Sequence, residues 1–240
     1  MANELTQRRV AALVTKGFEQ VELFEPRKAL EAVGATVQVV APDSQKVRGW
    51  NRTEWGEEVK VDVPLDSARA DDYDALLLPG GVMNPDRLRM NPKAVQFVKS
   101  FFENGKPIAV ICHGPWTLVE ADVVRGIRMT SFPSVKTDLI NAGADWVDEE
   151  VVVDRGIVSS RKPDDLPAFN RKMIEEFAEG EHKRQRGRMA ADAGEPRRGT
   201  ASEVAADRAP RGRENKPAPP SGRDERLKRA QRLPRKGDDE

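Results

Sequence analysis

The one cysteine of this 240-residue chain stands in a sequence typical of a reactive thiol. Cys112 ends an apolar run, residues 107–112, and His113, Gly114 and Pro115 follow it directly. A residue at such a strand-to-helix turn lies on a tight bend with its side chain directed at a cleft. The start of the following helix favours a thiolate, which is a strong nucleophile near neutral pH. The alternative is a core cysteine, because cysteine is often buried.

A histidine beside this thiol could act as its base. His113 is the only histidine between residues 8 and 180. Adjacent residues in an extended segment point to opposite sides, so His113 can meet Cys112 only if the bend rotates one of them. It could instead act through a neighbouring carboxylate that fixes its tautomer. The alternative role is a histidine that bonds the backbone at a helix start.

Two carboxylates are candidates for proton transfer. Glu19 lies in the segment after the first apolar run of the chain. Placed against Cys112 and partly desolvated, it would have a raised pKa and could shuttle a proton. The alternative for Glu19 is a helix N-terminal residue favoured by the helix dipole. Asp86 follows the glycine pair Gly80–Gly81 and, taken alone, would be a surface acid.

A glycine pair could supply backbone donors to the same reaction. Gly80 and Gly81 follow the apolar run 75–78 and one proline. Glycine lets the backbone approach a reacting group closely, and its N–H can bind a developing oxyanion. We expect Gly80, Gly81 and His113 to form such an oxyanion-binding group, the alternative being an ordinary turn after a strand.

The elements that must position these groups alternate along the chain. Continuous Val, Ile and Leu runs are typical of parallel strands covered on both faces, and their alternation with helical patterns predicts a doubly wound α/β sandwich. The predicted strands are residues 10–14, 37–41, 75–78 and 107–112, and the predicted helices are residues 21–33, 92–104, 115–121, 135–142 and 166–178. We interpret residues 48–63 as a β excursion or loop and residues 151–159 as a hairpin or edge pair.

This topology brings the candidate residues together. In an open parallel sheet, ligands bind at the carboxyl ends of the strands. Glu19, the Gly80–Gly81 pair and Cys112 follow the first, third and fourth predicted strands. We therefore expect a nucleophile, an acid/base pair and oxyanion donors along one edge of one sheet.

The charge distribution divides the chain near residue 180. The whole chain has 40 basic and 40 acidic residues, but residues 181–240 hold 17 Lys and Arg against 11 Asp and Glu, with almost no large apolar side chains. Such a segment cannot bury enough surface to offset its ordering entropy. We predict a catalytic domain over residues 8–180 and a charged, disordered tail over residues 181–240. Because acids are interleaved and aromatics are absent, the tail is not expected to bind nucleic acid.

Several classes of protein are excluded by composition. No apolar run approaches the roughly 18–20 residues of a membrane span, and no signal-peptide pattern opens the sequence. We therefore expect a cytoplasmic protein. One cysteine rules out an internal disulfide framework, and two histidines with one cysteine argue against a zinc site. We expect neither a metal nor an organic cofactor.

Four motifs together resemble the PfpI family of intracellular proteases. They are FEQVEL (18–23), LLLPGG (76–81), ICHGPW (111–116) and SSRKPDDLPAF (159–169). That family lies in the superfamily of the Parkinson-disease protein deglycase and the class I glutamine amidotransferase-like proteins. The resemblance implies a flavodoxin-like sandwich with its nucleophile on an elbow, and it covers nearly all of residues 8–178.

The resemblance also implies roles for single residues. It implies that Glu19 hydrogen-bonds the Cys112 thiol and that His113 is the partner histidine. Asp86 matches the loop from which, in several relatives, an acid of the neighbouring subunit completes a triad. Some of those relatives carry Glu there, and the shorter Asp side chain has less reach. Homodimers or hexamers are implied as well.

The implied activity is conversion of methylglyoxal or glyoxal to hydroxy acids without glutathione, together with removal of early glycation adducts. The reaction would pass through a hemithioacetal on Cys112, and the partner would be a small dicarbonyl or glycated substrate. Two alternatives remain open. One is an intracellular cysteine peptidase, which would need a well-aligned Cys–His pair. The other is a non-catalytic redox sensor or holdase that uses Cys112.

Overall fold

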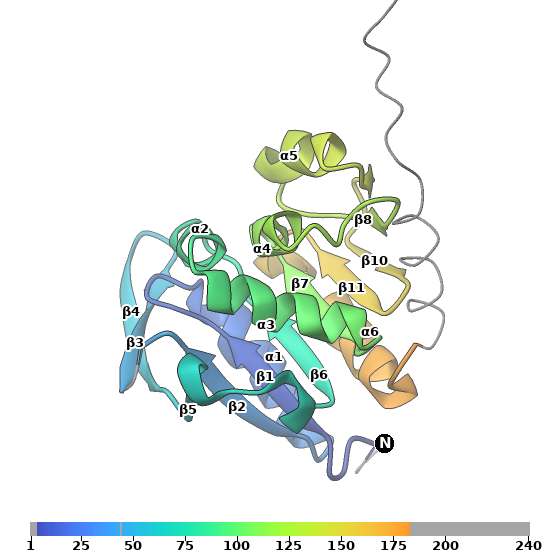
Figure 1. Cartoon of the computed structure of the whole chain (residues 1–240). Coiled ribbons are helices and arrows are strands. Elements are labelled where there is room, and N and C mark those ends of the chain that lie inside the picture. Colours follow the sequence, from blue (N-terminus) through green and yellow to red (C-terminus); the bar gives the residue numbers. More distant parts are fainter. Residues whose placement is uncertain (1–3, 44, 183–240) are drawn as a thin grey trace, which may run out of the picture. The chain divides into compact units, whose positions relative to one another are not determined.

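The computed structural model describes residues 4–43 and 45–182 (Figure 1). Its centre is a seven-stranded sheet in the order β10-β11-β7-β6-β1-β2-β5, in which only β10 runs antiparallel to its neighbour. The strands are β1 (Arg9–Leu13), β2 (Thr36–Ala41), β5 (Val63–Pro64), β6 (Ala75–Leu78), β7 (Ile108–Ile111), β10 (Val151–Asp154) and β11 (Ile157–Ser160). The α-helices are α1 (Gln20–Ala32), α2 (Met83–Arg89), α3 (Pro92–Glu103), α4 (Pro115–Glu120), α5 (Lys136–Asn141) and α6 (Leu166–Glu179).

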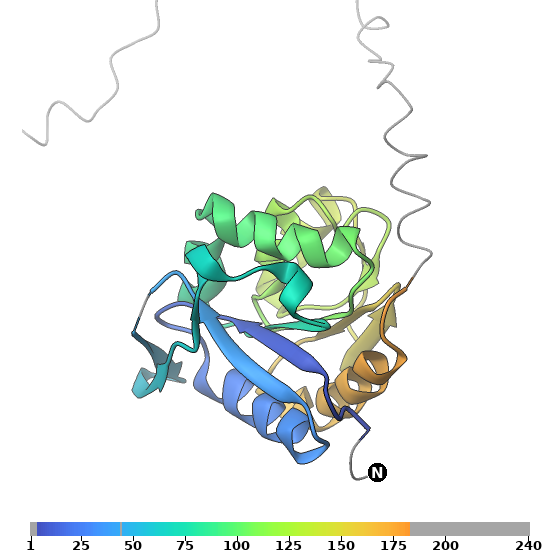
Figure 2. The same ribbon diagram turned by 60° about the horizontal axis from the view of Figure 1, so that its bottom comes forward.

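The central strands are apolar throughout because helices cover both faces of the sheet. Along β7, Ile108 and Val110 pack into one core cluster, whereas Ala109 and Ile111 pack into the other. This alternation follows from the period of two in a strand. Helices α3 and α4 contribute to the first cluster, and α1 and α6 contribute to the second. Figure 2 shows the sheet between these two helix layers.

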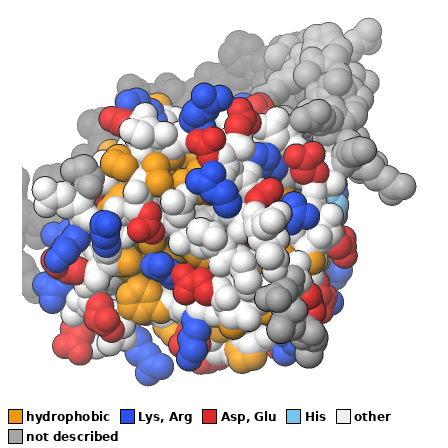
Figure 3. Space-filling model, turned by 90° about the horizontal axis from the view of Figure 1, so that it is seen from below, with side chains coloured by type: hydrophobic (Ala, Val, Ile, Leu, Met, Phe, Trp, Pro, Cys, Tyr) orange, Lys and Arg blue, Asp and Glu red, His pale blue; other side chains and the backbone are white. Residues whose placement is uncertain are grey.

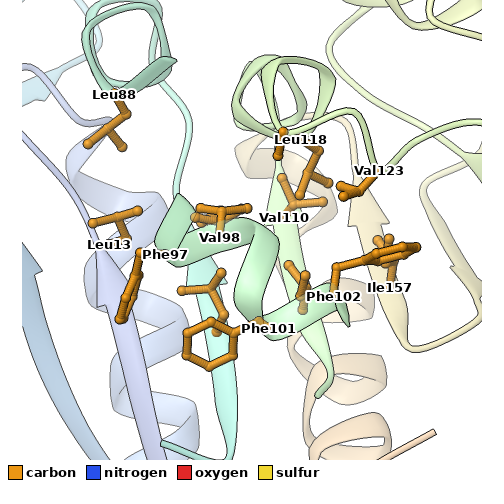
Figure 4. Packing of buried hydrophobic residues seen from close by; sticks show 14 of the residues in the cluster. Leu13, Leu88, Phe97, Val98, Phe101, Phe102, Val110, Leu118, Val123 and Ile157 are labelled. Carbon is orange, nitrogen blue, oxygen red and sulfur yellow. The ribbon is translucent and has the colours of Figure 1, made fainter. Parts of the chain in front are cut away.

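Helix α3 shows how the sequence specifies a covering helix. Asn91 caps its start, with the side-chain oxygen accepting from the backbone N–H of Lys93 at 3.0 Å. Phe97, Val98 and Phe101 recur at helical spacing on one face and are buried against the sheet (Figure 4). Replacing one such buried phenylalanine with alanine lowers the free energy of unfolding by about 3–5 kcal/mol.

A hairpin outside the main sheet lies beside the loop that follows β1. It consists of β3 (Lys46–Asn51) and β4 (Glu54–Lys60). The backbone N–H of Trp50 donates to the carbonyl of Phe18 at 2.6 Å, and Trp50 forms an isolated bridge with Glu19. The predicted β excursion is therefore a hairpin held against the first strand-end loop. A second small pair is formed by β8 (Arg128–Met129) and β9 (Asp145–Trp146).

The predicted α/β sandwich with a mainly parallel sheet is confirmed. One segment differs: the loop predicted around Asp86 is instead the helix α2. The prediction of a disordered tail concerns residues that lie outside the described part of the chain, except for Glu181 and His182. His182 donates its backbone N–H to the Gly105 carbonyl at 2.8 Å.

The surface carries charge of both signs. Figure 3 shows Lys and Arg interspersed with Asp and Glu over one face of the molecule. Among the described residues, no helix is long and apolar enough to span a membrane.

Candidate active site

Cys112 stands on the sharp turn between β7 and α4. Its φ is +62°, a left-handed conformation that costs a residue with a side chain about 1–2 kcal/mol. Two backbone hydrogen bonds hold the turn: Cys112 N donates to Ser160 O at 3.0 Å, and Phe132 N donates to Cys112 O at 2.9 Å. The nucleophile elbow is therefore built from β7, β11 and the segment before α5, and Cys112 is 6% exposed.

The bend brings Cys112 and its neighbour into contact. Cys112 Sγ lies 3.1 Å from His113 Nδ1, which is hydrogen-bond distance for sulfur. Neighbours in a strand point apart, but the positive φ of Cys112 turns the two side chains to the same side. The condition set by the sequence, that the bend rotate one residue, is met. A proton can pass directly between this thiol and this imidazole.

Aromatic rings enclose the His113 imidazole. Phe132 stacks on it with ring centroids 4.7 Å apart, and Trp116 meets it edge-on at 5.2 Å. This burial lowers the pKa of His113, because the charged imidazolium loses water. The side chain is thus neutral at neutral pH and able to accept a proton.

Glu22, rather than Glu19, is the carboxyl group beside the thiol. Glu22 is fully buried, its side chain hydrogen-bonds Cys112, and its Oε2 accepts from the Gly80 N–H at 2.8 Å. Burial raises the pKa of Glu22 to about 8. The hydrogen bond from the Gly80 N–H lowers this pKa by a smaller amount, and the charge of Glu19 raises it. The prediction that Glu19 hydrogen-bonds the thiol is wrong. Glu22, three positions later and on the buried face of α1, makes that bond instead.

Glu19 occupies the position just before α1, and its side chain makes no capping hydrogen bond to the helix. It is half-buried, and its Oε1 accepts from the Arg52 N–H at 3.4 Å, on the β3–β4 hairpin. The pKa of Glu19 is raised, because the effect of desolvation exceeds the opposing effect of the hydrogen bond from the Arg52 N–H. Among the described residues no hydrogen bond joins Glu19 to Cys112. Glu19 lies between the site and the hairpin, and this is the alternative that the sequence left open, a helix N-terminal Glu.

The glycine pair divides between two tasks. The Gly81 N–H, together with the N–H of His113, hydrogen-bonds the Cys112 sulfur. The Gly80 N–H, in contrast, is bound to Glu22 and is not available to an oxyanion. The expected oxyanion-binding group is therefore reduced to Gly81 and His113. Gly81 has φ +76°, a conformation that favours glycine.

The chain is similar to known proteins over most of the residues that the structure describes. Residues 8–176 match the model of the DJ-1/PfpI family. This chain belongs to the DJ-1/PfpI family. It is 46% identical over 166 residues to a deglycase of Pyrococcus abyssi, covering 69% of this chain and 97% of that protein. YraA of Bacillus subtilis, provisionally named a cysteine protease, is 45% identical over 168 residues, 70% of this chain and 96% of YraA.

A solved structure agrees with the fold. Drosophila melanogaster DJ-1beta superposes with a TM-score of 0.66 at 26% identity, covering 80% of this chain and 98% of that one. The chain thus has the fold of the DJ-1/PfpI family, and the resemblance inferred from the four motifs is confirmed.

The electrostatics of the thiol differ from the sequence expectation. Burial raises the pKa of Cys112, the Glu22 carboxylate raises it further, and the Gly81 and His113 N–H groups lower it. A resting thiolate, expected from the helix start, is therefore not favoured. While Glu22 holds its proton it carries no charge, so its repulsion is absent and it can donate to sulfur.

Asp86 lies apart from the other predicted residues. It is exposed on α2 and has no contact with His113 among the described residues. Its role across a subunit interface, implied by the DJ-1/PfpI resemblance, stays a prediction. Two residues that touch the site, Glu22 and Ser134, were not predicted from the sequence. The Ser134 hydroxyl lies 3.0 Å from His113 Nε2.

Replacing Gly80 with alanine is expected to destabilise the protein by about 1–3 kcal/mol. An added Cβ would lie 2.7 Å from both Cys112 Cβ and the Ile111 carbonyl oxygen, and 2.8 Å from Glu22 Oε2. None of these buried groups can move aside freely. Urea unfolding measures the loss. The matched control is Gly56→Ala, where the new methyl meets mainly the end of the flexible Gln20 side chain; equal stability of the two variants would contradict the argument.

The unfolding free energy is expected to fall as pH rises from about 4.5 to 8 by a contribution from Glu22. Its pKa is about 8 when folded against an ordinary 4.5, so the folded state binds more protons in this window. The slope from one such group is at most about 1.4 kcal/mol per pH unit. Glu22→Gln should remove it, so that its stability gains on wild type as pH rises. Parallel stability profiles for the two proteins would show that Glu22 ionises normally.

Proposed function

We propose that this protein is a cysteine-dependent enzyme that converts small reactive carbonyl compounds, as a glutathione-independent glyoxalase with deglycase activity. The observation that carries the proposal is the thiol of Cys112 held between a neutral imidazole and a buried, protonated carboxyl group. A base that takes the thiol proton and an acid that gives one are the two groups that addition to a carbonyl requires.

The first step forms a carbon–sulfur bond. The Cys112 sulfur attacks the aldehyde carbon of methylglyoxal, and the thiol proton passes to His113 Nδ1. The aldehyde oxygen becomes an oxyanion beside the N–H groups of Gly81 and His113, which already face the sulfur. Return of a proton to this oxygen completes the hemithioacetal.

The second step moves one hydrogen within the bound substrate. The proton on the former aldehyde carbon is transferred to the neighbouring carbon through an enediol, by way of Glu22 or His113, and a thioester of lactate results. Water then cleaves the carbon–sulfur bond, releasing lactate and restoring the thiol. The sum is methylglyoxal plus water giving lactate, so the oxidation of one carbon is balanced by the reduction of the other. With an early glycation adduct, the sulfur attacks the carbon that holds both the hydroxyl group and the amine. The carbon–nitrogen bond breaks as the carbon–sulfur bond forms, the amine leaves with the thiol proton, and the same hemithioacetal results.

The burial of the thiol supports a small substrate. Cys112 exposes 6% of its surface, and the adjacent His113 exposes 7%. A two- or three-carbon aldehyde needs little room around the sulfur, whereas a peptide carbonyl arrives with chain on both sides. The contact between Cys112 and His113 removes one objection to the peptidase alternative, because adjacent residues do align here.

Product analysis tests the proposal. The protein is incubated with methylglyoxal in the absence of glutathione, and lactate is followed by proton NMR. The control is the same protein alkylated with iodoacetamide at its one cysteine. Catalytic lactate formation that alkylation abolishes is the expected result. Loss of methylglyoxal without lactate would leave only adduct formation, and alkylation-sensitive cleavage of unfolded casein would favour the peptidase.

A further inference from the structure

Three side chains that can bind a metal ion meet where α6 ends. Glu176 and Glu179 lie in the last turn of the helix. Gly180 follows with φ +79°, and the chain then brings His182 beside the two glutamates. One ligand atom from each of Glu176, Glu179 and His182 lies within 4.8 Å of the other two. An imidazole nitrogen and two carboxylate oxygens are therefore close enough to share one ion.

The two inner ligand atoms lack hydrogen bonds. Glu176 is only 5% exposed, yet among the described residues neither its Oε1 nor His182 Nε2 takes part in a hydrogen bond. The two atoms instead contact each other as an ion pair. A buried polar atom without a hydrogen bond is unfavourable, and a carboxylate oxygen repels the lone pair of a neutral imidazole. A cation bound by both atoms removes both of these costs.

The charge at this end of α6 also favours a cation. The last carbonyl groups of a helix carry partial negative charge, which basic side chains in the last turn commonly offset. The last turn of α6 has no basic side chain, and it carries Glu176 and Glu179. The guanidinium group of Arg8, which lies beside Gly180, is paired with Asp74 at 3.5 Å.

The backbone fixes the position of His182. Its N–H donates to the carbonyl of Gly105 at 2.8 Å, in the turn between α3 and β7. The fit is close, because a Cβ added to Gly105 would lie 2.7 Å from the His182 carbonyl oxygen. This turn precedes β7, whereas Cys112 follows it. The cluster and the candidate active site are thus at opposite ends of one strand.

We propose that Glu176, Glu179 and His182 bind a divalent transition-metal ion of the zinc type, which fastens the end of α6 to the turn before β7. Zn²⁺ binds imidazole nitrogen and carboxylate oxygen at about 2.0–2.2 Å, so two ligand atoms of one tetrahedral ion lie about 3.3 Å apart. Small rotations of the three side chains give this spacing.

The imidazole decides the class of ion. Ca²⁺ and Mg²⁺ are bound by oxygen ligands, whereas an imidazole nitrogen suits zinc, copper and nickel. A metal was not expected from the sequence, because the chain has few Cys and His residues. In this cluster carboxylates supply two of the three ligands.

Nitrogen NMR on the full chain locates the ion. The chain has two histidines, so labelling histidine with ¹⁵N gives two pairs of ring signals, and His182→Gln assigns them. Near neutral pH, equimolar zinc chloride is expected to shift the ring signals of His182. Calcium chloride at the same concentration should leave them unchanged. Signals from His113 report separately on any binding of zinc at Cys112.

Affinity measurements identify the ligands. Competition with a chromophoric chelator is expected to show zinc binding at least about tenfold weaker in Glu176→Gln and in His182→Gln, since loss of a hydrogen-bonding partner of a ligand already costs that much. Glu175→Gln is the matched control, because Glu175 lies on the same helix but pairs with Lys172. Zinc should raise the unfolding midpoint of the wild type and of Glu175→Gln, and not that of His182→Gln. Circular dichroism shows whether each variant is folded.

Two results would overturn the proposal. One is a set of His182 ring signals that zinc leaves unchanged, whatever happens at His113. The other is equal zinc affinity in the wild type, Glu176→Gln and His182→Gln, which would leave His182 in a simple ion pair with Glu176. No measurement uses a carbonyl substrate or the thiol, so the result does not depend on the proposed function.

Discussion

Cys112→Ser is expected to lower kcat/KM for methylglyoxal by on the order of 10⁴-fold or more, to the background of the uncatalysed reaction. Serine keeps the shape of the turn and the hydrogen-bonding geometry. Its hydroxyl, however, is a far weaker nucleophile than sulfur when the nearby base is a neutral imidazole. Initial rates of lactate formation over a range of substrate concentrations measure the effect.

The interpretation depends on the variant being folded. The unfolding midpoint in urea serves as the control, since serine at position 112 replaces one small buried side chain with another. If Cys112→Ser retained more than a few per cent of wild-type activity, sulfur would not be the nucleophile. The binding of the carbonyl by surrounding groups would then have to explain turnover.

Glu22→Gln is expected to lower kcat/KM by about 10²–10³-fold, whereas Glu19→Gln should lower it only a few-fold. Glu22 is fully buried, hydrogen-bonds the thiol and keeps its proton near neutral pH, and the proposed mechanism therefore assigns it the role of the acid. Glutamine can still accept from the Gly80 N–H and donate to sulfur, but it cannot transfer a proton. The pair of variants, measured in the same lactate assay, separates the chemistry from the packing.

The comparison also tests the assignment of the two glutamates directly. Both changes are isosteric and lie one turn apart at the start of α1. Glu19 contacts the backbone of Arg52 and has no bond to sulfur among the residues that the structure describes. A larger loss in Glu19→Gln than in Glu22→Gln would mean that proton transfer runs through the hairpin side of the site, in line with the expectation from sequence.

The sheet and the position of the nucleophile could be predicted from the sequence because they depend on long, unambiguous signals. The strands are continuous apolar runs, and Cys112 ends one of them immediately before a Gly-Pro pair. Helix α2 could not be found this way. It is seven residues long, it contains Asn84 and Pro85, which are poor helix formers, and its start carries no capping side chain. Helix α2 packs against both α3 and α4, and this tertiary packing decides its conformation.

The choice of Glu22 over Glu19 as the carboxyl group beside the thiol depends on which residues of α1 face the sheet. Glu22, Pro26 and Leu30 follow each other at intervals of four, and all three are on the buried face of α1. This spacing indicates that Glu22 points into the sheet, and Glu19 precedes the helix. The Cys112–His113 contact could be stated only as a condition, because it depends on a backbone dihedral angle that sequence alone does not reveal.

The left-handed backbone of Cys112 has a consequence for anyone who tries to make the protein more heat-resistant. Glycine at position 112 would relieve the left-handed strain, and an uncharged, apolar side chain at position 22 would avoid burying a carboxyl group. A selection for thermal resistance without an activity screen could therefore remove the two residues on which the proposed reaction depends. Stabilising changes should be sought in the aromatic core under α3 and on the surface, and the turn after β7 should be kept unchanged.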